Sequence, residues 1–201
     1  MANYTASIQN LMNLLARLPG IGMRSAERIA FHMLKQSPED ALRLADAIRD
    51  VKERIKHCST CYNLTESDPC NICQDANRDQ GLVCVVEQPK DLLALEAAGS
   101  YKGVYHVLLG RIAPLEGTEI GDLTIDALMT RLAGGKVREL ILGTNPTMEG
   151  DTTALYIGNV AAEQFPNVAV TRLARGLPTG SSIEYANKNM LADAIAGRQR
   201  V

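Results

Sequence analysis

The stretch GLVCVVE, residues 81–87, carries five consecutive apolar side chains and ends on an acidic residue. A short, continuous apolar run rich in β-branched residues is typical of a strand buried on both faces of a sheet. Similar runs follow along the chain, at residues 103–110, 138–143 and 168–173. Helical stretches separate the runs, near residues 89–98, 122–133, 150–164 and 184–197. Strands that alternate with helices predict a mostly parallel sheet covered on both faces.

The N-terminal part shows helical periodicity instead. Apolar residues recur on one face of residues 8–17 and again of residues 24–35, which predicts two short helices. A third helix is expected to begin at Ser37-Pro38 and to run to about His57, because serine is a good N-cap and proline suits the first helical position. The fold class expected is therefore α/β with an N-terminal all-α module.

A glycine-rich turn, LPGIG at residues 18–22, joins the first two helices within the string LARLPGIGMRSAERIAFHML, residues 15–34. This string resembles the helix-hairpin-helix motif. Gly20 and Gly22 allow the backbone to come close to a phosphate, and their N–H groups with the following helix N-terminus form an anion site. Arg24 and Arg28, four residues apart on one helix face, are expected to add a second phosphate contact. Such contacts carry no base information, so sequence-independent DNA binding is expected.

The alternative for this string is an ordinary helical hairpin that needs its glycines only to turn. Charge favours a role in DNA binding, because residues 1–57 carry nine Lys/Arg against six Asp/Glu, in a chain whose net charge is −2.

No apolar run reaches the roughly 18 residues that span a bilayer, and the N-terminus lacks the pattern of a signal peptide. A cytoplasmic protein with no membrane contact is expected.

Four cysteines, Cys58, Cys61, Cys70 and Cys73, form the pattern C-x2-C-x8-C-x2-C. Thiols stay reduced in the cytosol, so two C-x-x-C pairs indicate a metal rather than disulfides. Four thiolates suit Zn²⁺ and leave no open coordination position, so one structural zinc per chain is expected. An iron–sulfur cluster and a redox dithiol are the alternatives. Cys84, within the apolar run, is expected to be a buried core residue.

Acidic residues follow two of the predicted strands: Glu87 ends the first, and Glu149 and Asp151 come after the third through the loop GTNPTM. Three carboxylates converging at the carboxyl edge of a parallel sheet could hold Mg²⁺. The arrangement resembles the Toprim domain of topoisomerases, primases and nucleases, which uses a Glu after one strand and Asp-x-Asp after another. Here Glu149 replaces the first Asp and no transesterifying tyrosine can be assigned. Solvated acids are the alternative, so no catalytic residue is expected and Mg²⁺ is not required.

Helix-hairpin-helix, four cysteines and Toprim-like core, in this order, resemble the RecR family over nearly the whole chain. HCxxC, CxxC, VVE, NPTxEG and GLPTGSSIEY are similar to that family's signatures. Met23-Arg24 stands where Pro-Lys is usual, and Asp151 where Glu is common, which leaves the exact phosphate contacts open. The domains expected are a DNA-binding helix-hairpin-helix module, a zinc finger, a Toprim domain and a C-terminal tail with its helix, at residues 1–56, 57–79, 80–175 and 176–201.

The resemblance implies a non-enzymatic recombination mediator in DNA repair. It implies a homodimer that pairs into a tetramer and clamps DNA, and that with RecO and RecF proteins helps load RecA at single-stranded gaps, acting at the nucleoid. One rival is a Mg²⁺-dependent Toprim nuclease or strand-cleaving enzyme; another is a zinc-stabilised adaptor that binds only protein. The sequence GLPTGSS lacks the Gly-Lys-Ser/Thr ending of a P-loop, so nucleotide hydrolysis is not expected.

Overall fold

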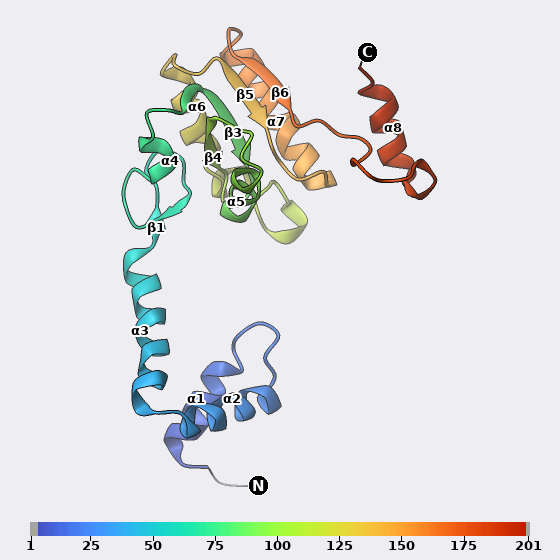
Figure 1. The fold of residues 1–201 in the computed structure, drawn as a ribbon. Helices are drawn as coiled ribbons and strands as arrows, with labels where there is room; N and C mark the ends of the chain where they lie inside the picture. The colour runs from blue at the N-terminus through green and yellow to red at the C-terminus, as the bar shows by residue number, and fades with distance from the viewer. Residues whose placement is uncertain (1–3, 200–201) are drawn as a thin grey trace. The chain divides into compact units, whose positions relative to one another are not determined.

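The computed structural model describes residues 4–199, and the chain divides into two compact units between Ile55 and Lys56 (Figure 1). The first unit is helical and the second contains the parallel sheet. The α/β class with an all-α N-terminal part is thus confirmed. Among residues 4–199, no helix combines the length and the apolar character needed to cross a membrane.

The first unit consists of α1 (Ala6–Leu15), α2 (Met23–Lys35) and α3 (Pro38–Arg54). Met12 of α1 and the small residues Ala26 and Ala30 of α2 are buried, which lets the two helices approach closely. Ser37 caps α3 as expected, because its side chain accepts a hydrogen bond from the Asp40 N–H at 3.1 Å. No residue of α3 is buried.

The expected extension of the third helix to His57 is wrong. The helix ends at Arg54, and Ile55 adopts extended backbone angles. Lys56 and His57 then form β1 (Lys56–His57), which pairs antiparallel with β2 (Leu64–Thr65). These two short strands and the one-turn helix α4 (Asn71–Gln74) were not predicted from the sequence.

The sheet of the second unit has four parallel strands in the order β4-β3-β5-β6. The strands are β3 (Asp79–Val86), β4 (Gly103–Val107), β5 (Glu139–Leu142) and β6 (Ala169–Arg172). The helices are α5 (Pro89–Ala97), α6 (Ile125–Ala133), α7 (Met148–Gln164) and α8 (Lys188–Ala196). Three 3-10 turns lie at Pro114–Glu116, Ile120–Asp122 and Ile183–Tyr185. The predicted parallel sheet is confirmed.

Some element ends differ from the prediction for local reasons. The strand expected at 103–110 ends at Val107, because Leu109 takes a left-handed φ of 65° that no strand can contain. The helix expected from 184 begins at Lys188, where Asn187 caps it. Helix α7 begins at Met148, two residues early, because the Thr147 side chain accepts a hydrogen bond from the Gly150 N–H.

The core lies on both faces of the sheet, because successive side chains of β3 point to opposite faces. Val83 and Val85 pack with α6 and α7, whereas Cys84 and Val86 pack with Leu92 of α5. The buried position expected for Cys84 is therefore confirmed, and burial raises the pKa of its thiol to about 12.

A largely buried ion pair ties the start of β3 to α5. The Arg78 guanidinium binds both oxygens of Glu96 and also donates to the Gly103 carbonyl at 3.0 Å. Tyr105 Oη donates to Glu96 Oε1 at 2.7 Å, so this carboxylate accepts three hydrogen bonds. The Arg78 and Glu96 side chains are only 17% and 24% exposed.

We expect Glu96→Gln to lower the free energy of unfolding of the second unit by about 1–3 kcal/mol, since it leaves the largely buried Arg78 with only its longer ion pair, to Asp75 at 3.7 Å, among the described residues. Urea denaturation at pH 7, followed by tyrosine fluorescence, measures the change. Glu163→Gln, on an exposed turn of α7, is the control and should unfold at the native midpoint. Equal midpoints for the native chain and Glu96→Gln would show that the ion pair adds nothing to stability.

Candidate functional sites

The four cysteine sulfurs converge on one point. Their Sγ atoms all lie within 4.8 Å of one another, with Cys61 to Cys70 at 3.5 Å and Cys58 to Cys73 at 4.0 Å. A tetrahedral zinc ion with Zn–S bonds of about 2.3 Å holds its sulfurs about 3.8 Å apart. Cys58, Cys61 and Cys70 are buried and Cys73 is half-buried. Both the donor set and the spacing fit Zn²⁺.

The backbone around each C-x-x-C pair turns tightly. The Tyr62 N–H donates to the Cys58 carbonyl at 2.9 Å, and Tyr62 takes a φ of 62° so that the chain can reverse. The Cys70 N–H donates to Cys58 Sγ at 3.3 Å, which couples the two pairs. The Ser59 N–H donates to Asp68 Oδ1 at 2.8 Å, which ties the loop between the pairs back to the first turn.

The cysteine thiols differ in proton affinity. Burial acts to raise the pKa of Cys58, but the N–H groups of Cys70, Cys61 and Thr60 outweigh it and lower that pKa to about 7. The hydrogen bond with Cys73, together with burial, instead raises the pKa of Cys61. A bound dication would displace the protons that remain on the thiols.

The cysteine cluster is supported by the sheet of the same unit. The Val107 N–H, at the end of β4, donates to the Cys61 carbonyl at 2.8 Å. The Tyr62 ring lies 5.4 Å from the ring of His106, the preceding residue of β4. His106 is fully buried, and burial lowers its pKa to about 4, so it is neutral at physiological pH. The cluster is thus fixed to a rigid strand end.

The glycine turn of the first unit has two different glycines. Gly20 takes a left-handed φ of 79°, which the turn itself requires. Gly22 is the N-cap of α2 with an ordinary φ of −86°, and a Cβ added there would meet no atom within 4 Å. The fold of this chain therefore requires glycine at position 20 but not at 22. The space beside Gly22 and the N-terminus of α2 is open to a ligand.

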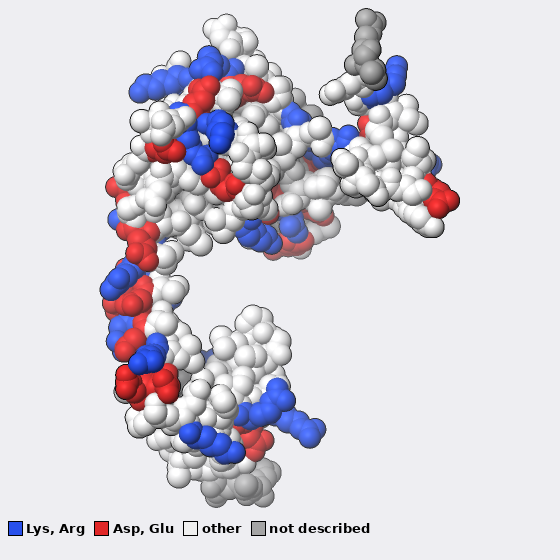
Figure 2. Space-filling model, in the orientation of Figure 1, with Lys and Arg blue, Asp and Glu red and all other residues white. Residues whose placement is uncertain are grey.

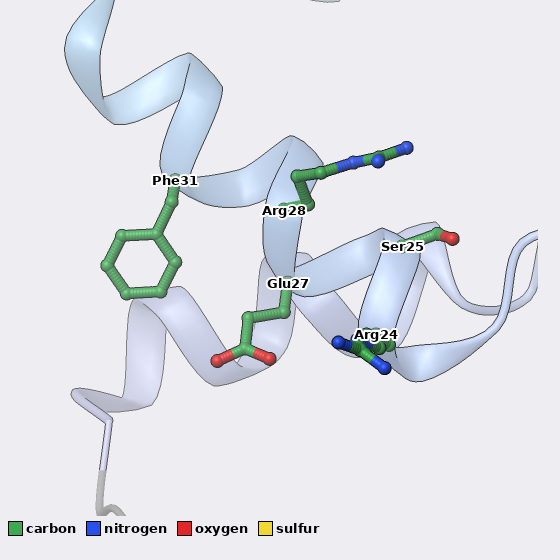
Figure 3. Close-up of a pocket in the computed structure, with 5 residues that line it drawn as sticks. All are labelled: Arg24, Ser25, Glu27, Arg28 and Phe31. Atoms are coloured by element: carbon green, nitrogen blue, oxygen red, sulfur yellow. The ribbon is translucent and has the colours of Figure 1, made fainter.

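Arg24 and Arg28 are both exposed on α2, and neither forms an ion pair with any residue in the range 4–199. Figure 3 shows both guanidinium groups extending outward from α2, in a shallow hollow that Ser25, Glu27 and Phe31 also line. The Glu27 carboxylate accepts a hydrogen bond from Tyr4 Oη instead of pairing with either arginine. The two arginines are therefore free to bind an anion.

Charge is distributed unevenly over the first unit. Figure 2 shows more basic than acidic side chains around α2, whereas the two kinds alternate along α3, and α1 itself carries no charged residue. On α3, Arg43 binds Glu39 at 2.8 Å and Arg49 binds Asp46 at 2.7 Å. The arginines of the hairpin helix, Arg24 and Arg28, are therefore left without an acidic partner among the described residues, whereas the arginines of α3 are paired.

The acidic residues of the sheet edge occupy three different environments. Glu87, directly after β3, is 2% exposed, and its Oε1 accepts a hydrogen bond from the Asn145 N–H at 2.8 Å. Gly150 packs so closely that an added Cβ would lie 2.7 Å from that oxygen, which explains the glycine at this position. Glu149 and Asp151 are half-buried in the first turn of α7.

Asp151 is bound by arginines rather than left free. Arg172 and Arg175 both donate to its Oδ1, and Arg175 also donates to Oδ2 at 3.1 Å. The hydrogen bond from Arg175 holds the pKa of Asp151 below its ordinary value, and the positive charges of both arginines act in the same direction. Arg111, whose guanidinium binds Glu116 at 3.0 Å, has its pKa raised first by that contact and further by Glu87 and Glu149.

Glu87, Glu149 and Asp151 could hold Mg²⁺ if they converged, but these three acids do not form a group of potential metal ligands. Within residues 4–199, the four cysteines are the one group of three or more potential ligands that comes together. The carboxylates do not fit Mg²⁺, because Glu87 and Asp151 already accept hydrogen bonds from the chain and arginines neutralise this edge. Sequence analysis missed Arg172 and Arg175, although both lie at or just beyond the end of β6, at the sheet edge where the acids lie.

Comparison with known proteins agrees with this architecture. A family model described as RecR, helix-hairpin-helix matches residues 8–52, and a second model, which describes the four-cysteine zinc finger domain of RecR, matches residues 55–75. A model described as Toprim domain matches residues 81–174. Fold and sites thus define a protein with a helix-hairpin-helix, a four-cysteine zinc finger and a Toprim domain.

Similar proteins identify the family within this class. A Recombination protein RecR from Rhodopirellula baltica is 53% identical over 201 residues and covers 100% of both chains. Proteins of the same name from Rubrobacter xylanophilus, 49% identical over 100% of both chains, and Desulforudis audaxviator, 48% identical over 98% of this chain and 99% of the relative, are similar throughout. The chain belongs to the RecR family, which gives it a role in recombinational DNA repair.

We expect Cys70→Ser to lower bound zinc well below one ion per chain and to raise hydrogen exchange in residues 57–75, because three thiolates bind zinc more weakly than four. Elemental analysis and exchange mass spectrometry measure the two effects. Cys84→Ala, which removes a cysteine outside the cluster, is the control and should keep its zinc. A native chain without stoichiometric zinc, its cysteines in disulfides, would refute the metal site.

Proposed function

We propose that the chain is a non-enzymatic recombination mediator that binds DNA through the phosphates and holds one structural zinc ion on Cys58, Cys61, Cys70 and Cys73. The observation that carries the DNA role is the open face formed by Gly20, Gly22, Arg24 and Arg28. Its two arginines lack acidic partners among the described residues, and nothing in the described chain fills the space beside Gly22.

Phosphate chemistry explains this combination of groups. The N-terminus of α2 presents free N–H groups and the positive end of the helix dipole, and Gly22 keeps that end uncovered. Arg24 and Arg28 supply charge and forked hydrogen-bond donors on the next helical turn. Contacts from these groups to phosphate oxygens carry no base information, so the proposed binding is independent of sequence.

The first unit also supports self-association. Its helices expose a continuous apolar face, lined by Leu11, Leu14, Leu15, Leu18, Met33, Leu34, Ala41, Leu42, Leu44, Ala45 and Ile48. On this face Leu42 is 62% exposed and Ile48 is 59% exposed, and a contiguous apolar surface of this kind is typical of a protein interface. We propose a homodimer that pairs further into a tetramer, so that several hairpins grip one DNA as a clamp.

The family suggests the setting in which the clamp acts. We propose that the protein works with RecO and RecF proteins to help load RecA at single-stranded gaps, in the cytoplasm and at the nucleoid. Its proposed parts are a DNA-binding module at residues 1–56, a zinc finger at 57–79, a Toprim domain at 80–175 and a C-terminal tail at 176–201. Neither Glu87 nor Asp151 is free for metal-dependent cleavage, which supports a non-enzymatic role.

We expect the purified protein to show no Mg²⁺-dependent cleavage of end-labelled DNA, because its sheet edge lacks a convergent set of free carboxylates among the described residues. Glu87→Ala should behave like the native chain in the same assay. A Mg²⁺-dependent nick made by the native protein and abolished in Glu87→Ala would establish a nuclease and overturn the proposal of a non-enzymatic mediator.

We expect the double variant Arg24→Ala with Arg28→Ala to weaken binding to all DNA sequences alike. Each phosphate contact that the substitutions remove should reduce the slope of log affinity against log salt by about 0.7 for single strands or 0.9 for duplex. Fluorescence anisotropy over a range of salt concentrations measures the affinity and the slope. Zinc content and oligomeric mass should stay at their native values, because neither arginine is buried.

A matched control removes the same number of charges from the same unit. Arg43 and Arg49 lie on α3 and are already paired with acidic residues. Arg43→Ala with Arg49→Ala should therefore affect the salt slope far less than the hairpin variant. Native affinity and native slope in the hairpin variant would show that the hairpin is only a structural turn.

A further inference from the structure

Two arginines occupy the acidic edge of the sheet, where the sequence allowed a Mg²⁺ site but did not require one. We infer that Arg172 and Arg175 act as built-in counter-cations of Asp151, so that the acidic edge of the sheet anchors the C-terminal segment, residues 173–197, instead of binding a divalent cation. This inference goes beyond the proposed function, because it concerns neither DNA nor zinc.

The contacts of Asp151 carry the inference. Its Oδ1 accepts hydrogen bonds from Arg172 and Arg175, and its Oδ2 accepts from Arg175 Nη1 at 3.1 Å. Arg175 therefore binds the carboxylate through both of its terminal nitrogens, in the paired geometry that makes arginine–carboxylate contacts strong. A divalent cation at Asp151 would have to displace two positive charges.

The acids near Asp151 also interact with other groups of the chain. Glu87 is buried against Gly150 and accepts the Asn145 N–H, so its carboxylate cannot turn toward Asp151 without breaking that bond. Arg111 lies near enough for the charges of Glu87 and Glu149 to act on it while it binds Glu116. Mg²⁺ binds few protein ligands, but those ligands must be free and correctly placed. At this edge, arginines bind the Asp151 carboxylate in place of a metal ion.

The C-terminal segment has few other means of attachment. None of the residues of α8 is buried. Gly176 takes a φ of 149°, and a Cβ added there would lie 3.4 Å from the Cα of Ala194, so the segment folds back on itself just after Arg175. Arg175 thus lies directly before the segment that folds back. Its pairing with Asp151 fixes the position at which this segment, with α8, leaves the sheet.

The test compares the native chain with Asp151→Asn, which keeps the shape of the side chain but removes its charge. We expect amide hydrogen exchange in residues 173–197 to rise roughly 1.5- to fivefold, the range expected for a partly exposed ion pair. Arg172→Ala with Arg175→Ala should produce the same rise. The triple variant, with Asp151→Asn, Arg172→Ala and Arg175→Ala, should exchange little faster than Asp151→Asn alone, because both sets of changes remove the same interaction.

The absence of a metal at this edge is tested with Mn²⁺, which has a spectroscopic signal and oxygen preferences close to those of Mg²⁺. Electron paramagnetic resonance of the zinc-loaded native protein in millimolar Mn²⁺ should show no stoichiometric binding. One bound Mn²⁺ per chain that disappears in Asp151→Asn would overturn the inference.

Asp79→Asn is the matched control, since it removes the charge of another ion pair in this unit, with Arg138 at 2.7 Å. It should leave exchange in residues 173–197 at the native rate. If Asp151→Asn exchanges there like the native chain, the arginines do not anchor the segment. If both the Asp151 and the arginine variants raise exchange equally through residues 79–172, the pair stabilises the whole unit, and the inference of a specific anchor is wrong.

Discussion

Burial of β3 on both faces is the constraint on which the second unit depends. The strand pairs with β4 on one side and β5 on the other, and its side chains enter the two halves of the core alternately. A strand buried in this way cannot slip by one residue without exchanging the contents of the two faces. The register of β3 therefore fixes where the strand ends. Because Glu87 directly follows β3, the register also fixes the position of Glu87.

The same constraint reaches the cysteine cluster. β4 is held beside β3, and its last residue, Val107, donates a backbone hydrogen bond to the Cys61 carbonyl. The cluster is too small to bury much apolar surface, so the strand end, together with a zinc ion when one is bound, would supply the order that a core supplies elsewhere. Each function-bearing part of this unit is thus positioned by the edge of the sheet.

The sequence predicted well those features in which local pattern determines structure. Two residues between paired cysteines leave little choice but a tight turn, so the four cysteines that come together could be named without a structure. Apolar runs located the strands for the same reason. The end of α3 was missed because Lys56 and His57 leave the helix to pair with residues 64 and 65, a contact that helical periodicity does not contain. The environment of Asp151 was missed because its partners lie 21 and 24 residues further along the chain and meet it only once the sheet forms.

Arginine has opposite roles in the two units, and its surroundings decide which. Arg172 and Arg175 share the Asp151 carboxylate, which compensates part of their charge inside the unit. Arg43 and Arg49 are exposed but lie three or four residues from acids on the same helix, where pairing is local and weakens their outward field. Arg24 and Arg28 form no such ion pair among the described residues, although Glu27 lies between them: its carboxylate accepts a hydrogen bond from Tyr4 instead. A net charge of −2 therefore does not oppose DNA binding. What attracts a phosphate is charge that remains uncompensated where an approaching backbone can reach it, and in the first unit that charge lies beside the open N-terminus of α2.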